Sequence, residues 1–210
     1  MRKVTGVRQL TQTKYLNLYE LDMENDNGSH SPYYVSSRAK TIDHLKLKTK
    51  KNTADGVIIY SLYGEKKDRV VLIRQYRCPL DGYIYEFPAG LVEPGETFKE
   101  AGIRELKEET GLDFTPVDAP EEYCKPFFTT VGMTDESCGT IYGYAHGTPS
   151  RDGQEATEDI EIVLADKAEV RRILREENVA IMCAYMLMHF LEAPEGQAFA
   201  FLENANGTER

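Results

Sequence analysis

Residues 1–52 are polar overall but contain two stretches with the pattern of β-strands. Residues 14–23 (KYLNLYELDM) mix apolar and polar positions, and residues 33–39 (YYVSSRA) return to residue types that favour strands. The segment between them is rich in Asn, Gly, Ser and Pro, so the pattern predicts a β-hairpin. The basic, turn-rich residues 46–56 then mark a boundary between a small antiparallel β-sheet domain and a larger domain over residues 53–210.

The larger domain alternates β-type runs with helical patterns. β-Branched and aromatic residues are concentrated in six segments, which we predict as strands: 56–64, 69–77, 83–90, 127–133, 137–147 and 160–165. Helices are predicted over three segments: 97–110, 166–177 and 179–191. This order of elements predicts an α+β or mixed α/β sandwich around a central sheet. The C-terminal residues 195–210 are expected to be partly loose.

The helix predicted over residues 97–110 has clear start and stop signals. Thr97 and Glu100 form a T-x-x-E capping box, in which each residue satisfies a free backbone N–H of the first turn. Gly111 suits the left-handed backbone conformation that commonly ends a helix. We therefore expect a helix that begins and ends at defined residues.

One face of this helix carries three carboxylates. With Glu105 set at zero, Glu108 falls at about 300° and Glu109 at about 40°. Such carboxylates repel one another, whereas a divalent cation attracts them, since Mg²⁺ and Mn²⁺ prefer carboxylate oxygens. Taken alone, a charge cluster more often faces solvent. A second stripe, expected to face the core, consists of Ile103, Leu106 and Thr110.

The chain is acidic, with 25 Lys and Arg against 35 Asp and Glu among 210 residues and a net charge of −10. This charge argues against general binding to nucleic-acid backbones, which requires a basic surface. The longest apolar run, residues 179–191, is too short to span a membrane. The four cysteines form no CxxC pair, and the N-terminus lacks the apolar run of a signal peptide. We therefore expect a cytoplasmic protein with reduced thiols and without a structural zinc site or a membrane partner.

The glycines and charged residues around the acidic helix have a specific spacing. Residues 90–112 read GLVEPGETFKEAGIRELKEETGL. The nine positions that carry the pattern are Gly90, Glu96, Arg104, Glu105, Leu106, Glu108, Glu109, Gly111 and Leu112. This stretch resembles a complete Nudix box. The resemblance implies a Nudix-type α/β/α sandwich with a mixed central sheet, and hydrolysis of a nucleoside diphosphate linked to another group with Mg²⁺ or Mn²⁺ as cofactor.

The resemblance also implies roles for individual residues. The implied metal ligands are Glu105, Glu109, Glu108 (directly or through water) and the backbone carbonyl of Ala89. Arg104 would complete the catalytic group by pairing with Glu96, which would hold the loop against the helix.

The flanks of the box indicate a branch of the family. VVLIRQYR (residues 70–77) and YEFPAGLVEPGE (residues 85–96) resemble ADP-ribose pyrophosphatases, in which an N-terminal sheet domain precedes the Nudix domain and two subunits interlock. The resemblance implies a homodimer that hydrolyses ADP-ribose, or a related nucleoside diphosphate sugar, to a nucleoside monophosphate and a sugar phosphate. A UDP-sugar or dinucleoside polyphosphate hydrolase is an alternative. A non-catalytic nucleotide-sugar sensor is another, although such sensors tend to lose box glutamates.

Several residues outside the box are candidates for substrate contacts. Arg74 and Arg77 could each clamp a pyrophosphate with two hydrogen bonds, or form a surface ion pair. Glu86 could accept from a ribose or adenine donor, or simply lie on the sheet. Tyr33, in the N-terminal hairpin with Arg38, could stack on a base or pack at a dimer interface.

Two later segments depart from the pattern of this branch. Val131 stands where the branch has a proline associated with a preference for ADP-ribose, while Glu136 remains a candidate for contact with the terminal ribose or a metal-bound water. The branch places its general base, a glutamate, on a loop after the box. Glu158 fits that position best and Glu155 is second, and Ala156 stands where the branch often has a further glutamate. The choice between Glu155 and Glu158 therefore stays open. For either residue, the alternative that it is simply a solvated acid of the loop also stays open.

Overall fold

The structure is a computed structural model that describes residues 1–155 and 158–204. It forms two compact units. The first unit consists of residues 1–55 and 126–138, and the second consists of residues 56–125 and the described residues from 139 onward. Ala156 and the last six residues of the tail therefore lie outside the described residues.

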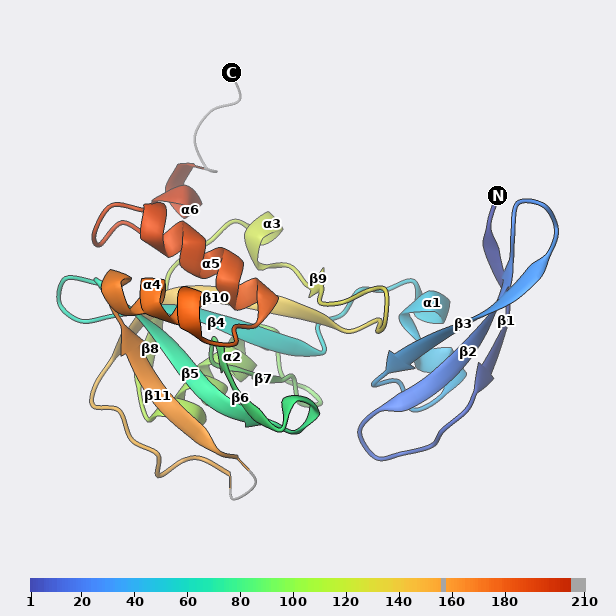
Figure 1. The fold of residues 1–210 in the computed structure, drawn as a ribbon, viewed down its shortest axis with the longest axis horizontal. Helices are drawn as coiled ribbons and strands as arrows, with labels where there is room; N and C mark the ends of the chain where they lie inside the picture. The colour runs from blue at the N-terminus through green and yellow to red at the C-terminus, as the bar shows by residue number, and fades with distance from the viewer. Residues whose placement is uncertain (156–157, 205–210) are drawn as a thin grey trace. The chain divides into compact units, whose positions relative to one another are not determined.

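The first unit contains an antiparallel sheet of three strands. These are β1 (Lys3–Gln9), β2 (Asn17–Glu24) and β3 (His30–Ser37), in that order (Figure 1). The predicted hairpin is β2–β3, and it is confirmed. Tyr19 pairs with Val35 across it, and Leu45 packs against both. The sequence pattern does not predict β1, because none of its residues is fully buried.

The first unit also contains short elements. They are the 3-10 helix η1 (Ile42–His44), the helix α1 (Lys46–Thr49) and the strand β9 (Phe127–Phe128). The strand predicted over residues 127–133 is wrong beyond Phe128. Thr130 O instead accepts hydrogen bonds from Met133 N and Thr134 N, at 2.8 and 3.0 Å, which closes a turn.

The second unit is built on the larger sheet. Its strands are β4 (Gly56–Tyr63), β5 (Arg69–Arg77), β6 (Gly82–Glu86), β7 (Ala89–Leu91), β8 (Asp113–Pro116), β10 (Ser137–His146) and β11 (Ile160–Ala165), with β10 beginning in the first unit. Its helices are η2 (Cys78–Leu80), α2 (Phe98–Thr110), α3 (Glu121–Cys124), α4 (Lys167–Glu176), α5 (Ile181–Glu192) and α6 (Ala200–Asn204). The main path of the sheet runs β11-β5-β4-β10-β8, and β6 and β7 pair with β5 and β4.

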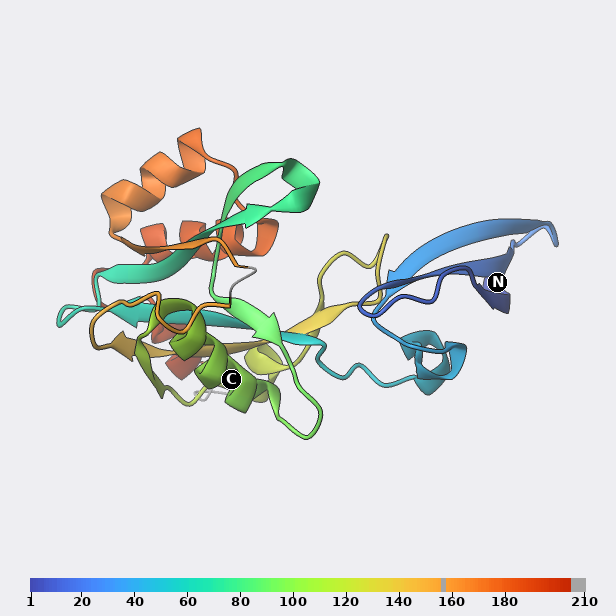
Figure 2. The ribbon, with the colours of Figure 1, turned by 90° about the horizontal axis from the view of Figure 1, so that it is seen from below.

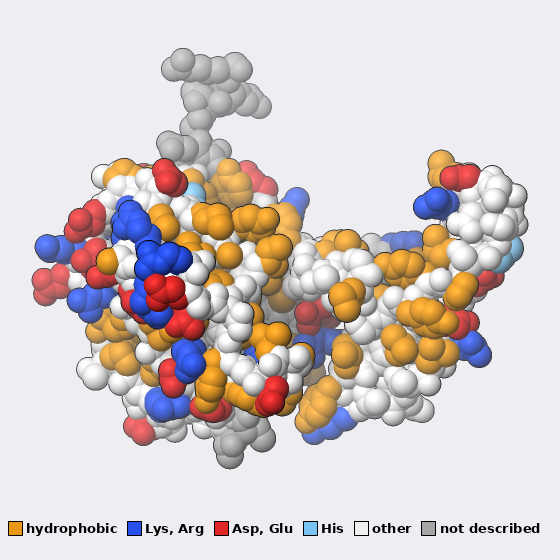
Figure 3. Space-filling model, in the orientation of Figure 1, with side chains coloured by type: hydrophobic (Ala, Val, Ile, Leu, Met, Phe, Trp, Pro, Cys, Tyr) orange, Lys and Arg blue, Asp and Glu red, His pale blue; other side chains and the backbone are white. Residues whose placement is uncertain are grey.

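Helices cover both faces of this sheet. Figure 2 shows α4 and α5 on one face and α2 on the other. The predicted α/β/α sandwich with a mixed central sheet is confirmed. Under α2, the buried cluster consists of Val57, Ile59, Val71, Ala101, Leu106, Leu112, Ile141 and Ala145. α5 exposes Ile181, Tyr185 and Met188, and Figure 3 shows hydrophobic atoms gathered over this helix. No helix of the described residues is both long enough and apolar enough to cross a membrane.

The C-terminal segment is more ordered than the sequence predicts. Ala198, Phe199 and Leu202 are buried, and the Phe199 ring lies 5.3 Å from the Tyr60 ring between centroids. Phe201 contacts the rings of further aromatic residues of the second unit, and the helix α6 is part of its core. Residues 198–202 are therefore held by apolar side chains that complete the core, and the expected looseness of the tail stays a prediction for its other residues.

Candidate active site

The helix α2 forms as its sequence predicts. Thr97 Oγ1 accepts from Glu100 N, and Glu100 Oε2 accepts from Thr97 N at 2.8 Å, which completes the capping box. Gly111 ends the helix with a φ of 71°. Gly102 lets the helix approach the sheet, because a Cβ there would lie 2.4 Å from Ile141 Cδ1. α2 is therefore fixed closely against β10.

This close approach changes which face of α2 is buried. Leu106 and Thr110 are buried as predicted, but Ile103 is 42% exposed. Contact through Ala101 and Gly102 turns Ile103 away from the core, so its predicted place in the core stripe is wrong. The same contact turns Glu109 inward.

Glu109 is the most buried carboxylate of the site, with an exposed fraction of 2%. The N–H of Ala89 donates to its Oε2 at 3.2 Å, which links the helix to β7. Burial raises the pKa of Glu109 well above its ordinary value, and the charges of Glu105 and Glu158 raise it further. Glu105 and Glu158 therefore lie close enough to Glu109 to disfavour its negative charge.

Glu105 lies directly against Gly90. A Cβ at position 90 would come within 1.9 Å of Glu105 Cδ, so only glycine leaves room for this carboxylate. The pKa of Glu105 is raised by burial, although a hydrogen bond from Arg104 opposes this effect. Gly90 therefore controls where the Glu105 carboxylate lies.

Arg104 holds the box together. The predicted ion pair with Glu96 is confirmed: two guanidinium nitrogens donate to its two carboxylate oxygens, both at 3.0 Å. Arg104 also donates to the carbonyl of Leu91 at 3.1 Å and lies 2.9 Å from both Glu105 and Glu108. It thereby fixes the loop before α2 onto the helix, and the pKa of Glu96 is lowered as a result.

The loop that carries Glu155 and Glu158 is attached to the end of α2. Gln154 Nε2 donates to Glu109 O at 2.7 Å, and Ser150 N donates to Thr110 O at 2.9 Å. These bonds satisfy carbonyls that a helix end leaves free. The charge of Glu158 raises the pKa of both Glu105 and Glu109, whereas Glu155 is exposed.

The donor set of the site suits a hard divalent cation. Carboxylates of Glu105, Glu109 and Glu158 supply only oxygen atoms, which Mg²⁺ and Mn²⁺ prefer. Among the described residues, however, no three acidic, His or Cys side chains already converge as metal ligands. Glu105 and Glu108 instead share the Arg104 guanidinium, and the Glu108 side chain is 47% exposed. A bound cation would have to compete with Arg104 for Glu105.

The candidates for substrate contact in the second unit are all engaged. Arg77 pairs with Glu86 at 2.8 Å, so the structure brings two of them together. Arg77 also lowers the pKa of Glu109, which places its charge near the carboxylates. Arg74 pairs with Glu161 at 3.1 Å, as the ion-pair alternative predicts. The guanidinium of Arg74 also lies 4.0 Å from the centre of the Tyr83 ring.

The remaining candidates belong to the first unit. Arg38 donates to Glu136 Oε1 at 2.8 Å, and the Tyr33 hydroxyl donates to the carbonyl of Gly132 at 2.5 Å. Val131 lies in the turn that begins at Thr130 and is 66% exposed. The structure therefore brings Tyr33, Arg38 and Glu136 together around the turn after β9.

Sequence reasoning did not identify some residues that support the site. In the sequence, Gln154 is one residue of a segment predicted only as a polar loop. In the structure, its side chain holds that loop to α2. Tyr83 and Asp159 are 76 positions apart, and the hydrogen bond between them (2.5 Å) has no local signal in the sequence.

The architecture assembled above is that of a Nudix domain: a sandwich in which a glutamate-bearing helix follows a strand with a closely approached glycine. The chain belongs to this family, since the sequence model of the NUDIX domain matches residues 52–183.

Known proteins resemble parts of the chain. The ADP-sugar pyrophosphatase of Mus musculus is 38% identical over 117 residues, which cover 50% of this chain and 54% of that protein. The ADP-ribose pyrophosphatase of Saccharomyces cerevisiae is 28% identical over 132 residues, or 60% of this chain and 53% of that protein. The chain thus spans little more than half of these relatives. A solved structure titled as an ADP compounds hydrolase shares the fold with a TM-score of 0.58 and 19% identity, covering 83% of each chain.

Proposed function

We propose that the chain is a divalent-metal-dependent pyrophosphatase that hydrolyses ADP-ribose, or a related nucleoside diphosphate sugar, to a nucleoside monophosphate and a sugar phosphate. The observation that carries the proposal is the buried carboxylate of Glu109. Its pKa is raised by burial and by the charges of Glu105 and Glu158. Burial of like charges is unfavourable unless a partner compensates them. The names of the two pyrophosphatase relatives support the substrate class.

The residues of the site have distinct roles in this proposal. Glu105, Glu109 and the carbonyl of Ala89 would hold Mg²⁺ or Mn²⁺, with Glu108 joining directly or through water. The ion would partly neutralise the pyrophosphate and stabilise the negative charge that develops on its oxygens during hydrolysis.

Glu158 is the proposed general base, in preference to Glu155, because of the two only Glu158 affects the pKa values of Glu105 and Glu109. It accepts a proton from water as the water oxygen bonds to one phosphorus and the bridging P–O bond breaks. The phosphate oxygen of the other half leaves. Arg77 and Arg74 would contact the pyrophosphate after releasing Glu86 and Glu161. Tyr33, Arg38 and Glu136 belong to the first unit, and contact of these residues with the nucleoside or the terminal ribose stays a prediction from the sequence.

We further propose that residues 1–52 act as a dimerisation domain of a homodimer and that residues 53–210 form the Nudix hydrolase domain. Leu16, Leu18 and Tyr34 of the first unit are between 37% and 51% exposed, which suits an apolar contact with a second copy. Light scattering of the full chain tests this state directly, and a monomer at micromolar concentration would contradict it.

The experiment that tests the function is phosphate-coupled product analysis over ADP-ribose, UDP-sugars and dinucleoside polyphosphates with Mg²⁺ or Mn²⁺. We expect the highest kcat/KM with an ADP-sugar, and Glu158→Gln to lose at least a hundredfold in kcat while Glu155→Gln stays near wild type. If the protein hydrolyses only UDP-sugars or only dinucleoside polyphosphates, the proposed ADP-sugar class is wrong and that alternative class is the substrate. Tight ADP-ribose binding without hydrolysis of any compound would refute the enzyme and favour a sensor.

A further inference from the structure

The residue that follows the proposed base is held on two sides by the hairpin of β5 and β6. Asp159 Oδ2 accepts a hydrogen bond from the Tyr83 hydroxyl at 2.5 Å. Its carbonyl oxygen accepts a second bond, from Tyr76 N at 3.1 Å. Beyond it, β11 pairs continuously with β5, beginning at Ile160 opposite Gln75. Asp159 is therefore the attachment point between a fixed strand and the loop with Glu158.

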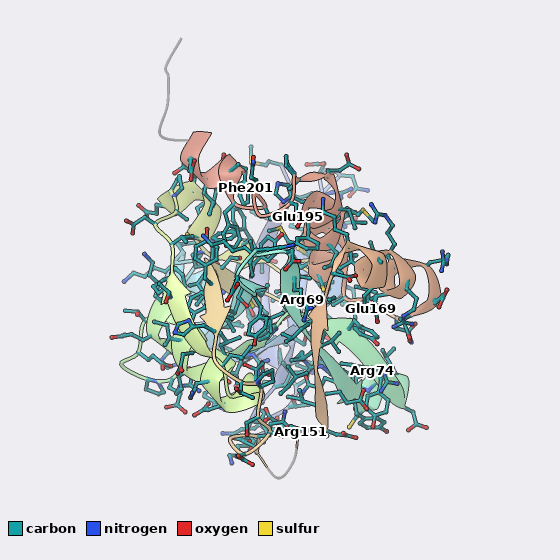
Figure 4. All side chains as sticks on the ribbon, turned by 90° about the vertical axis from the view of Figure 1, so that its left-hand side faces the viewer. Arg69, Arg74, Arg151, Glu169, Glu195 and Phe201 are labelled. Carbon is teal, nitrogen blue, oxygen red and sulfur yellow. The ribbon has the colours of Figure 1, made fainter. Side chains whose placement is uncertain are left out.

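Tyr83 is itself fixed from two directions. The Arg74 guanidinium lies 4.0 Å from the centre of its ring and pairs with Glu161 on β11. The Tyr76 ring meets it edge-on, at 5.7 Å between centroids. Figure 4 shows Arg74 beside β11. The Tyr83 hydroxyl is thus presented to Asp159 by a side chain that is already held in place.

Glu158 has little else to hold it among the described residues. Its N–H donates to Glu155 O at 2.9 Å, and its own Oε2 accepts from Glu155 N at 3.0 Å. Both bonds are made to another residue of the same loop, so they do not attach Glu158 to the sheet or to α2. The position of Glu158 relative to Glu105 and Glu109 then depends on Asp159 at one end of the loop and on Gln154 at the other.

We propose that Tyr83 is a positioning residue, whose hydroxyl fixes Asp159 and thereby sets where the Glu158 carboxylate lies relative to Glu105 and Glu109. The inference rests on the proposed hydrolysis and on Glu158 as its base. Tyr83 acts through its neighbours and needs no contact with the substrate.

The matched variants are Tyr83→Phe and Tyr76→Phe. Both remove one hydroxyl from the same hairpin, but the Tyr76 hydroxyl donates to Asp81 Oδ1 at 2.6 Å and not to Asp159. We expect Tyr83→Phe to lower kcat about five- to tenfold with KM within twofold, because a misplaced base affects the chemical step. Tyr76→Phe should match wild type in both constants. A normal kcat in Tyr83→Phe, or an equal loss in both variants, would overturn the proposal.

A second test shows whether Tyr83 acts through Glu158. In a Glu158→Gln background, Tyr83→Phe should cause no further loss of kcat, since two residues of one pathway are not additive. A full five- to tenfold loss in that background would overturn the positioning role.

A third measurement does not depend on activity. Amide hydrogen exchange at Glu158 should be faster in Tyr83→Phe than in wild type and unchanged in Tyr76→Phe. If wild type hydrolyses none of the diphosphates, the proposed function fails, while faster exchange still supports the anchoring by Tyr83. Unchanged exchange in Tyr83→Phe would overturn that anchoring whatever the activity.

Discussion

Replacing Glu109 by Gln separates the charge of this buried side chain from its shape. Gln has nearly the same volume, and its Oε1 can still accept the N–H of Ala89. Because the folded pKa of Glu109 is raised, the folded protein binds its proton more tightly than the unfolded chain does. The stability that this difference contributes is present below the ordinary pKa of 4.5 and is lost as pH rises through the folded value. Without metal, we therefore expect Glu109→Gln to unfold at a higher temperature than wild type at pH 8.

Added metal should reverse that order. Mg²⁺ at about a hundred times its Kd would stabilise wild type by about 2.7 kcal/mol. For a chain of this size, that corresponds to a rise in Tm of about 5–10 °C. If losing one ligand weakens binding a hundredfold, the same Mg²⁺ concentration gives the variant only about 0.4 kcal/mol, or a rise of about 1 °C.

The assay is thermal unfolding at several pH values with and without Mg²⁺, together with turnover of ADP-ribose. The matched control is Glu100→Gln, on the same helix, because Gln can also complete the capping box with Thr97. The control should keep the Mg²⁺-dependent rise and the turnover, whereas Glu109→Gln should lose both. A Glu109→Gln variant with a normal Mg²⁺-dependent rise and normal turnover would refute the metal site.

Three further predictions concern the packing around the site. Gly90→Ala should lower Mg²⁺-dependent turnover at least tenfold with an unchanged circular dichroism spectrum, because its Cβ would displace Glu105, 1.9 Å away; normal turnover would contradict the close packing. Phe199→Ala should lower the free energy of unfolding by about 3–5 kcal/mol in urea titrations, since this buried ring packs on Tyr60; a loss below about 1 kcal/mol would show that the tail is loose. Burial lowers the pKa of His189, so the folded protein resists its protonation, and stability should fall as pH drops below the ordinary value of 6.5. His189→Gln should show a smaller fall between pH 7 and 5.5 in urea titrations, and an equal fall would contradict this cause.

The parts of the fold that were predictable are those with strong local signals. α2 carries its own start and stop signals in Thr97, Glu100 and Gly111, and the structure places its ends at those residues. The strands β4 and β5 are rich in β-branched residues and lie where the sequence places them; β4 is buried up to its last residue, and β5 is buried from Val70 to Ile73.

The errors arise where tertiary contacts override local patterns. A simple projection of α2 assigns Ile103 to the core, but close contact through Gly102 moves the buried face toward Glu109. The sequence predicts a partly loose tail, yet Phe199 and Phe201 complete an aromatic cluster made by residues far away in sequence. The link from Tyr83 to Asp159 joins two elements that only the folded sheet brings together, so no spacing rule could have found it.

The attachment of the loop at both ends also bears on how the chain can change in evolution. Gln154 is tied to α2 and Asp159 to the β5–β6 hairpin, with only four residues between them. An insertion within those four would let Glu158 drift, and a deletion would pull one end free. Length differences between this chain and its descendants should therefore accumulate before Ser150, while the short segment with Glu158 keeps its length even where its other side chains diverge.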